Sequence, residues 1–280
     1  MSLAVMLLVL CGAALHATWN TIIKAGSDKL LDTVLVACGA AVFAALALPF
    51  VPLPARESWP YLGASAAIHL AYFSLVALAY QTGELSYAYP IMRGSAPPFT
   101  AILASLTLRE PLSSGAWVGI ALISIGILGL TGDSWRSGRS PLAPAAFGLL
   151  NAAVIVAYTL VDGIGVRSAG HALSYILWLF VLIPFPLLTM VLVVRRGAVF
   201  GQFAVRWRPG ILAGACTTVS YGVALWAMTL VPIALVAALR ETSVIFGTVF
   251  ASLFLGERFG PVRYLAALAV TAGAVAIKLF

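Results

Sequence analysis

RGSAPPFTAILASLTLRE, residues 93–110, aligns without a gap with RETSVIFGTVFASLFLGE, residues 240–257, and seven of the 18 positions are identical. The identities include the arginine that opens each segment and the glutamate that closes it, two residue types that are rare in apolar sequence. Gly126 and Gly273 lie at the same offset. Self-similarity at one fixed offset indicates an internal repeat, so we expect the two halves of the chain to share one structure.

Composition places both halves in a membrane. Of the 280 residues, 62% are hydrophobic and 9% are charged, whereas about 25% of an ordinary soluble protein is charged. A spanning helix needs about 20 apolar residues. Ten segments of suitable length follow one another: 3–24, 31–53, 59–81, 85–108, 111–131, 142–163, 171–194, 207–230, 232–255 and 260–280. We therefore predict an all-α polytopic membrane protein with ten transmembrane helices.

The repeat divides these segments into two groups of five, residues 1–134 and residues 135–280. Because five is odd, the second group enters the membrane from the opposite side, so the two five-helix repeats are inverted. Transporters built from inverted repeats bind their cargo near the bilayer midplane, between the repeats, and expose it to either side by alternating access. The predicted class is a secondary transporter.

Several other classes lack the residues they need. The net charge of +7 comes from basic residues scattered between apolar runs, so nucleic acid is not an expected partner. The sequence contains no phosphate-binding loop, no cysteine–histidine cluster and no paired acids within a span. We therefore expect no enzymatic activity, no cofactor and no metal. The expected partners are the lipid bilayer and a small-molecule substrate.

Two arginines are the strongest candidates for binding. Arg93 and Arg240 each lie about nine residues into a predicted span, which is about 13 Å deep and close to the midplane. A charge at that depth needs a partner or a water-filled cavity. The pair suits an anionic group such as a carboxylate or phosphonate, although a structural ion pair would also explain it.

Glu241 is the only acid that the sequence places firmly within a span. Three functions stay open for it: neutralising Arg93 across the interface between halves, binding a substrate ammonium, or carrying a coupling proton. Burial favours the protonated acid, whereas the adjacent Arg240 favours the carboxylate. We favour a fixed carboxylate and exchange of a zwitterion.

Polar and aromatic side chains supply the remaining candidates. The stretch HATWNTIIK puts polar residues on one face of the first span, and YAYP begins the fourth span with a proline that frees a backbone carbonyl. Pro97 and Pro98 are expected to interrupt that helix again, either to line a cavity or as a structural kink. The remaining predicted substrate-binding residues are His16, Trp19, Asn20, Lys24, His69, Tyr72, Tyr89, Tyr158 and Tyr221.

The segments LASLTLREPLS (103–113) and FASLFLGERFG (250–260) give the chain a family resemblance. It resembles the ten-span EamA-type transporters of the drug/metabolite transporter superfamily. The resemblance implies a basket of ten helices around a cavity lined by spans one, three, four, six, eight and nine, and transport without ATP hydrolysis. We expect the protein to lie in a bacterial inner membrane, as a monomer or homodimer. The segments HATWN (16–20) and YPIMRG (89–94) are similar to a branch associated with phosphonate utilisation.

The expected cargo is a small zwitterionic or anionic metabolite, such as an amino acid or aminophosphonate, moved by an exporter or exchanger. A proton-coupled exporter of drugs and other cations is an alternative, and a coupling proton is a candidate second cargo. The first span has His16 and Asn20 where small multidrug transporters place a glutamate, and two midplane arginines would repel a cation. A membrane-embedded lipid-handling enzyme is the alternative from another class.

Overall fold

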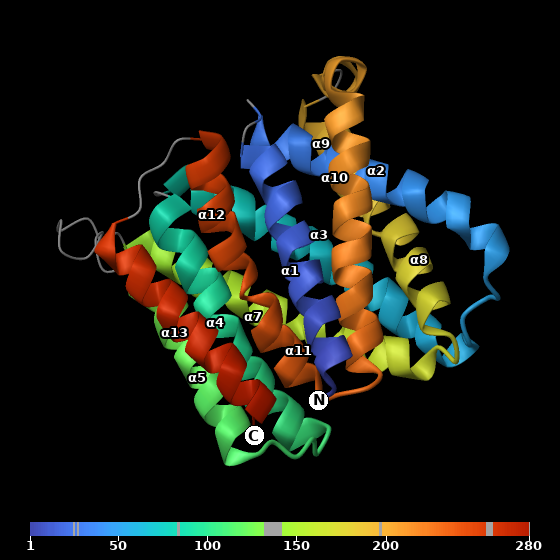
Figure 1. Ribbon diagram of the computed structural model, residues 1–280. Coiled ribbons are helices and arrows are strands. Elements are labelled where there is room, and N and C mark those ends of the chain that lie inside the picture. Colours follow the sequence, from blue (N-terminus) through green and yellow to red (C-terminus); the bar gives the residue numbers. More distant parts are fainter. Residues whose placement is uncertain are drawn as a thin grey trace.

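A computed structural model describes residues 1–24, 26, 28–82, 85–131, 142–195, 198–255 and 260–279, which form helices and connections and include no β-strand. Figure 1 shows the helices side by side around a shared interior. Their bounds are α1 Leu3–Lys24, α2 Lys29–Ala47, η1 Leu48–Phe50, η2 Arg56–Ser58, α3 Trp59–Thr82, α4 Leu85–Thr107, α5 Ser114–Gly129, α7 Leu142–Ser168, α8 Ala172–Leu182, α9 Pro184–Arg195, α10 Ala198–Met228, α11 Ile233–Arg240, α12 Ser243–Leu255 and α13 Pro261–Leu279.

Each predicted span overlaps a helix or a helix pair, although α10 begins at Ala198, inside the predicted connection 195–206. Two spans are divided: the seventh into α8 and α9, and the ninth into α11 and α12. By length and hydropathy, six stretches of the described chain can cross a membrane: Leu3–Ile23, Leu30–Phe50, Leu142–Ser168, Ala172–Arg195, Phe203–Met228 and Pro261–Leu279. Four predicted spans fall below that standard. The third and fourth contain polar residues in α3 and α4, the fifth has only the 16 residues of α5, and the ninth is divided.

The two ends of the chain lie together. Lys278 Nζ donates a hydrogen bond to the backbone oxygen of Met1 at 3.4 Å, and both termini are at the bottom of Figure 1. We call this side the terminal face. Arg167, near the end of α7, forms an ion pair with Glu110, which follows α4. Gly119, near the start of α5, lies beside Gly273 and Ile277 near the end of α13. Since α1 begins at the terminal face and α7 ends there, the two helices run in opposite directions.

Contacts between the halves follow a reciprocal pattern. The first helix of the chain, α1, packs on α10, α11 and α12, and α7 packs on α3 and α4. Small residues permit close approach where α5 meets α13. A Cβ at Gly119 would lie 2.6 Å from the carbonyl oxygen of Gly273, and one at Gly126 would lie 3.0 Å from that of Ala266. At the sequence offset of the repeat, these two contacts are equivalents of each other.

The prolines of α4 do not interrupt it. Pro90, Pro97 and Pro98 all lie inside one continuous helix from Leu85 to Thr107, so the prediction of a second break at Pro97–Pro98 is wrong. The helix is held between α5 and α7, and neighbouring helices in a membrane protein can compensate for the hydrogen bonds that proline removes. Packing therefore overrides the local preference.

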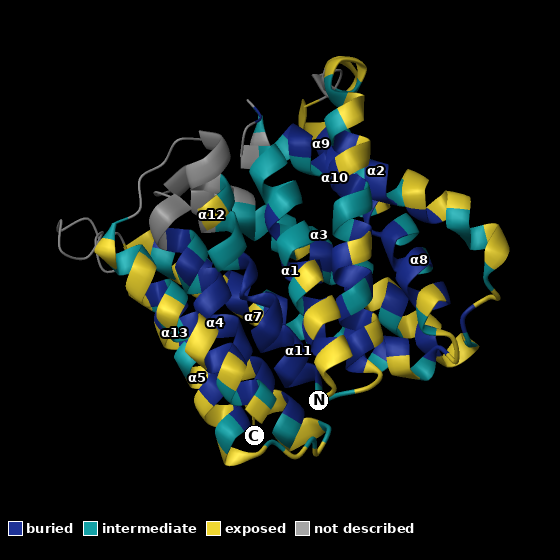
Figure 2. Ribbon diagram, in the orientation of Figure 1, coloured by how far each residue is buried: buried dark blue, intermediate teal, exposed yellow. Residues whose placement is uncertain are grey.

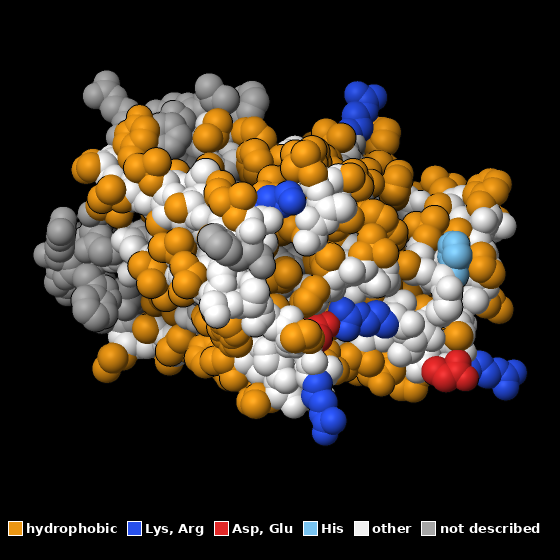
Figure 3. Space-filling view, turned by 60° about the horizontal axis from the view of Figure 1, so that its bottom comes forward, with side chains coloured by type: hydrophobic (Ala, Val, Ile, Leu, Met, Phe, Trp, Pro, Cys, Tyr) orange, Lys and Arg blue, Asp and Glu red, His pale blue; other side chains and the backbone are white. Residues whose placement is uncertain are grey.

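The exterior of the bundle is apolar. Burial is concentrated where helices face one another (Figure 2), and large hydrophobic side chains are exposed on the outer surfaces, including Leu46, Phe50, Leu106, Leu142 and Val205. In Figure 3, which brings the terminal face forward, hydrophobic side chains dominate and charged side chains are few. A surface of this kind is stable in a lipid bilayer, where apolar side chains need no cover.

The close contact between α5 and α13 can be tested with single methyl groups. Because the Cβ of Gly273→Ala would lie 2.5 Å from the Gly119 oxygen, we expect a loss of about 1–3 kcal/mol in stability, measured as a lower unfolding temperature in detergent. Gly129→Ala is the matched control, since a Cβ there meets no described atom within 4 Å. Equal unfolding temperatures for the two variants would contradict the close packing.

Candidate functional site

A cavity lies among the helices, and eight of the predicted site residues line it. Helices α1, α3, α4, α7, α10 and α11 contribute side chains, as the family resemblance implies, and α2 and α8 contribute as well. The lining residues are His16, Trp19, Thr33, Val36, Ala37, Ala40, His69, Tyr72, Phe73, Arg93, Tyr158, Phe180, Ile183, Thr217, Tyr221 and Arg240. The predicted site therefore forms one cavity in large part.

The cavity lies between the midplane and the face opposite the termini. Trp19 is near the end of α1, which begins at the terminal face, and Thr33 is near the start of α2, which begins at the opposite face. On the terminal face, Glu110 Oε1 forms an ion pair with Arg167 Nη1 at 2.6 Å, and Glu110 Oε2 accepts a hydrogen bond from the backbone N–H of Ile233. These contacts join α4, α7 and α11 beneath the cavity.

Arg93 and Glu241 form an ion pair between the two halves of the chain. Arg93 Nε lies 2.8 Å from Glu241 Oε2, and both side chains are buried. This is the first of the three functions that the sequence left open for Glu241, and it is confirmed. Arg93 also lines the cavity, and its Nη2 is buried with no hydrogen-bond partner in the described structure. The guanidinium therefore has an unused donor near the cavity.

A break between α11 and α12 separates the two neighbouring charges. Arg240 is the last residue of α11, and Glu241 and Thr242 form a turn whose N–H groups bond to Ala238 and Leu239 three residues back. Arg240 places its guanidinium carbon 4.6 Å from the centre of the Tyr221 ring. Adjacent residues thus serve different neighbours: Glu241 neutralises Arg93, and Arg240 rests on an aromatic face that attracts cations.

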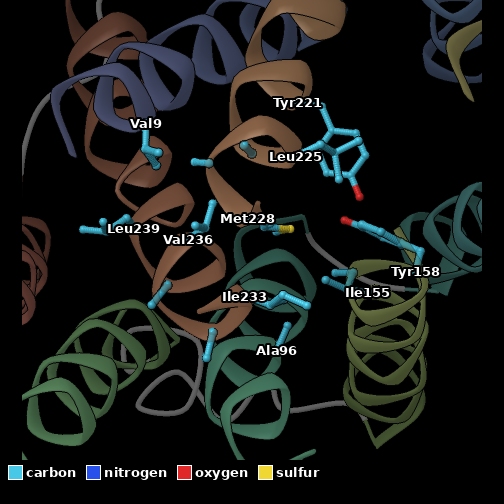
Figure 4. Packing of buried hydrophobic residues seen from close by; sticks show 14 of the residues in the cluster. Val9, Ala96, Ile155, Tyr158, Tyr221, Leu225, Met228, Ile233, Val236 and Leu239 are labelled. Carbon is cyan, nitrogen blue, oxygen red and sulfur yellow. The ribbon is translucent and has the colours of Figure 1, made fainter. Parts of the chain in front are cut away.

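Aromatic rings form one wall of the cavity. His69 lies 4.6 Å from Tyr158, ring centre to ring centre, and Tyr158 lies 6.0 Å from Tyr221 in an edge-to-face arrangement. Figure 4 shows Tyr158 and Tyr221 turning their hydroxyl ends toward each other from α7 and α10. On α1, His16 and Trp19 are in edge contact at 5.0 Å, and Trp19 Nε1 is a buried donor with no hydrogen-bond partner within the described chain.

Three described residues of the predicted set do not line the cavity. Asn20 donates its amide hydrogen to the backbone oxygen of His16 at 2.8 Å, a bond within α1. Glu241 is occupied by Arg93, and Tyr89 lies one turn before Arg93 in α4. The side chain of Lys24 lies outside the described residues.

The sequence interpretation missed a second acid. Asp162 is fully buried in α7, so the statement that Glu241 is the only acid within a span is wrong. Its Oδ1 accepts a hydrogen bond from Tyr175 at 2.9 Å, and its Oδ2 accepts one from Tyr221 at 2.6 Å. Hydropathy ends the sixth span at residue 163, whereas α7 continues to Ser168. Asp162 therefore resembled a residue at the membrane surface.

The ion pair between the halves makes a quantitative prediction. Either Arg93→Gln or Glu241→Gln leaves one buried charge unpaired, which costs about 3–5 kcal/mol, while the double variant removes both charges. We therefore expect the double variant to unfold at a higher denaturant concentration than the sum of the single effects gives. Additive losses would show that the two side chains do not depend on each other.

Comparisons with known proteins agree with this architecture. A solved structure described only as a crystal structure of a protein superposes with a TM-score of 0.72 at 15% sequence identity, over 99% of this chain and 98% of that one. Such a likeness shows a shared fold alone. No curated protein matches the chain.

The sequence profile of the EamA-like transporter family matches residues 3–132. That match and the apolar helices identify an integral, multi-pass membrane protein. Over residues 3–132 the chain thus matches the EamA-like transporter family, part of the drug/metabolite transporter superfamily.

Proposed function

We propose that this protein is a secondary-active or facilitative transporter of a small zwitterionic or anionic metabolite, such as an amino acid or aminophosphonate. The observation that carries the proposal is the cationic character of the cavity. Arg240 lines it without an ion-pair partner among the described residues, and Arg93 lines it with Nη2 unused. A carboxylate or phosphonate would supply acceptors for these donors and for Trp19 Nε1.

The proposed cargo has two poles. Its acid group would bind Arg240 and Nη2 of Arg93. Its amine would lie toward Glu241, which is paired with Arg93 and does not itself line the cavity. Because Glu241 already neutralises Arg93, the local charge before binding is that of Arg240, and one anionic group on the cargo would balance it. Small size is supported by the bulky rings that line the cavity, including Trp19, Tyr72 and Phe180.

We further propose alternating access by two inverted five-helix repeats, residues 1–134 and 135–280. Three observations support this: the opposite directions of α1 and α7, the reciprocal contacts of α5 with α13, and the ion pair that joins the halves. In this arrangement the contacts of Glu110 with Arg167 and Ile233 close the terminal face. Exposure of the cavity on that side requires that these contacts separate.

Export of a lipophilic cation is the competing function, because the aromatic wall offers faces that attract cations. The Tyr221 face is already occupied by Arg240, which would repel a second cation. A ligand-stabilisation screen of the purified protein separates the two functions. We expect L-amino acids or 2-aminoethylphosphonate to raise the unfolding temperature, and lipophilic cations such as tetraphenylphosphonium to leave it unchanged. The reverse pattern would favour the cation exporter.

Arginine variants test the site itself. Arg240→Ala should abolish the stabilisation by anionic ligands and uptake into proteoliposomes, because it removes the uncompensated cation of the cavity. Arg240→Lys should restore little if the contact uses two donors of one guanidinium plane. Arg56→Ala, at an exposed arginine in η2 on the terminal face, is the matched control. Normal binding by Arg240→Ala would show that this arginine is structural.

A further inference from the structure

Asp162 is a buried acid for which the proposed anion site has no use. The side chain is fully buried, and the groups that bond to it are the hydroxyls of Tyr175, Tyr221 and Ser65. All three are neutral donors. Within the described structure, Asp162 has no ion pair with Lys or Arg, in contrast to Glu241, Glu110 and Asp32. A buried carboxylate without a paired cation is costly to keep ionised in a membrane interior.

Two of its neighbours connect Asp162 to the cavity. Tyr221 lines the cavity and donates directly to Oδ2. His69 also lines the cavity, and its Nδ1 lies 2.9 Å from the backbone oxygen and 3.2 Å from the hydroxyl of Ser65. Because a carbonyl oxygen only accepts, Nδ1 carries the hydrogen and Nε2 of the neutral ring is free to accept one. Two short chains of groups can therefore pass a proton between the cavity and Asp162: Tyr221 alone, and His69 followed by Ser65.

The charges of the site link Asp162 to the anion. Arg93 and Glu241 cancel each other, so Arg240 is the remaining cation of the cavity. Arg240 lies against one face of Tyr221, whose hydroxyl bonds to Asp162. Asp162 and Arg240 therefore share the Tyr221 side chain as a neighbour, and a negative charge on Asp162 would offset part of the positive charge of Arg240. Protonation of Asp162 would remove this offset, so an anionic cargo would then bind more favourably beside Arg240.

We propose that Asp162 is a proton-binding site of the transporter, and that a proton on Asp162 and an anion at Arg240 favour each other's binding. The step is the addition of one proton from cavity water to a carboxylate oxygen, which forms one O–H bond. The proton is thus a co-substrate, held on Asp162 rather than on Glu241. The anion linkage rests on the proposed function, whereas the proton site does not.

Titratable and hydroxyl groups from four helices packed on α7 lie around this acid. Facing it are His69 and Ser65 from α3, Tyr175 from α8, Tyr221 from α10 and, beyond the Tyr221 ring, Arg240 from α11. Helix α4 contacts α7 through Met92, which accepts a hydrogen bond from Asn151, and its Arg93 lines the cavity together with Tyr158 of α7. His69 is the neighbour that can itself change charge near neutral pH, so the test must distinguish a carboxyl group from an imidazole.

Infrared spectroscopy makes that distinction without a ligand. The protein is made by cell-free synthesis with ¹³C-carboxyl aspartate, or in parallel with ¹³C-carboxyl glutamate, and is titrated around neutral pH. We expect the C=O band of a protonated carboxylic acid to appear as the pH falls, and to shift in frequency only with labelled aspartate. The band should be absent from Asp162→Asn and present in Asp28→Asn, a control at the acid that caps α2.

The outcomes that overturn the proton site are definite. They are a band that shifts with labelled glutamate, a band that persists in Asp162→Asn, and the absence of any band that titrates around neutral pH. Because the isotope arms use the unaltered chain, they remain decisive even if Asp162→Asn fails to fold.

A binding experiment tests the linkage to the anion. L-alanine and taurine are suitable probes, since their acid groups stay ionised around neutral pH. Wild-type affinity should rise by about 5- to 150-fold as Asp162 takes up its proton, the usual range for coupled sites, and Asp162→Asn should bind tightly at every pH. Equal pH dependence in the two proteins would overturn the linkage. Absence of binding by either probe would remove the linkage and count against the proposed function, leaving the proton site to the infrared result.

Discussion

The cost of charge inside a membrane is the constraint on which this structure depends. Arg93 would cost about 2.5–3.5 kcal/mol to insert alone, and Glu241 meets that need from the other half of the chain at 2.8 Å. This ion pair joins the two halves of the chain and also has a structural effect beyond neutralising the two charges. It holds α4 against the break between α11 and α12, and so fixes the centre of the cavity.

The break between α11 and α12 lies at this ion pair. In an unbroken helix, Arg240 and Glu241 would project about 100° apart, and the turn at Glu241–Thr242 further separates their surroundings. Glu241 forms the ion pair with Arg93, and Arg240, the residue before it, lines the cavity. Small residues elsewhere allow this centre to be enclosed, because α5 and α13 approach closely at Gly119 and Gly273.

Hydropathy and the repeat were sufficient to predict the helical segments and the charged residues that are costly to place inside a membrane, such as Arg93 and Arg240. The sequence also predicted His69, Tyr158 and Tyr221 as residues of one binding site, and all three line the cavity. Predictions of helix breaks from local sequence patterns were wrong where tertiary packing determines the backbone. The prolines of α4 remain in a continuous helix, and the broken helix is α11–α12, which contains no internal proline. Asp162 was missed because hydropathy ended the sixth span at residue 163, directly after it, although α7 continues to Ser168.

The most direct test of the anion cavity is the position of a bound anion. Methylarsonate has the shape and charge of a phosphonate, and its arsenic atom can be located by anomalous scattering in crystals of the protein. The account predicts an arsenic peak inside the cavity, in contact with Arg240 and with Nη2 of Arg93. A peak elsewhere, or an empty cavity at saturating methylarsonate, would contradict it.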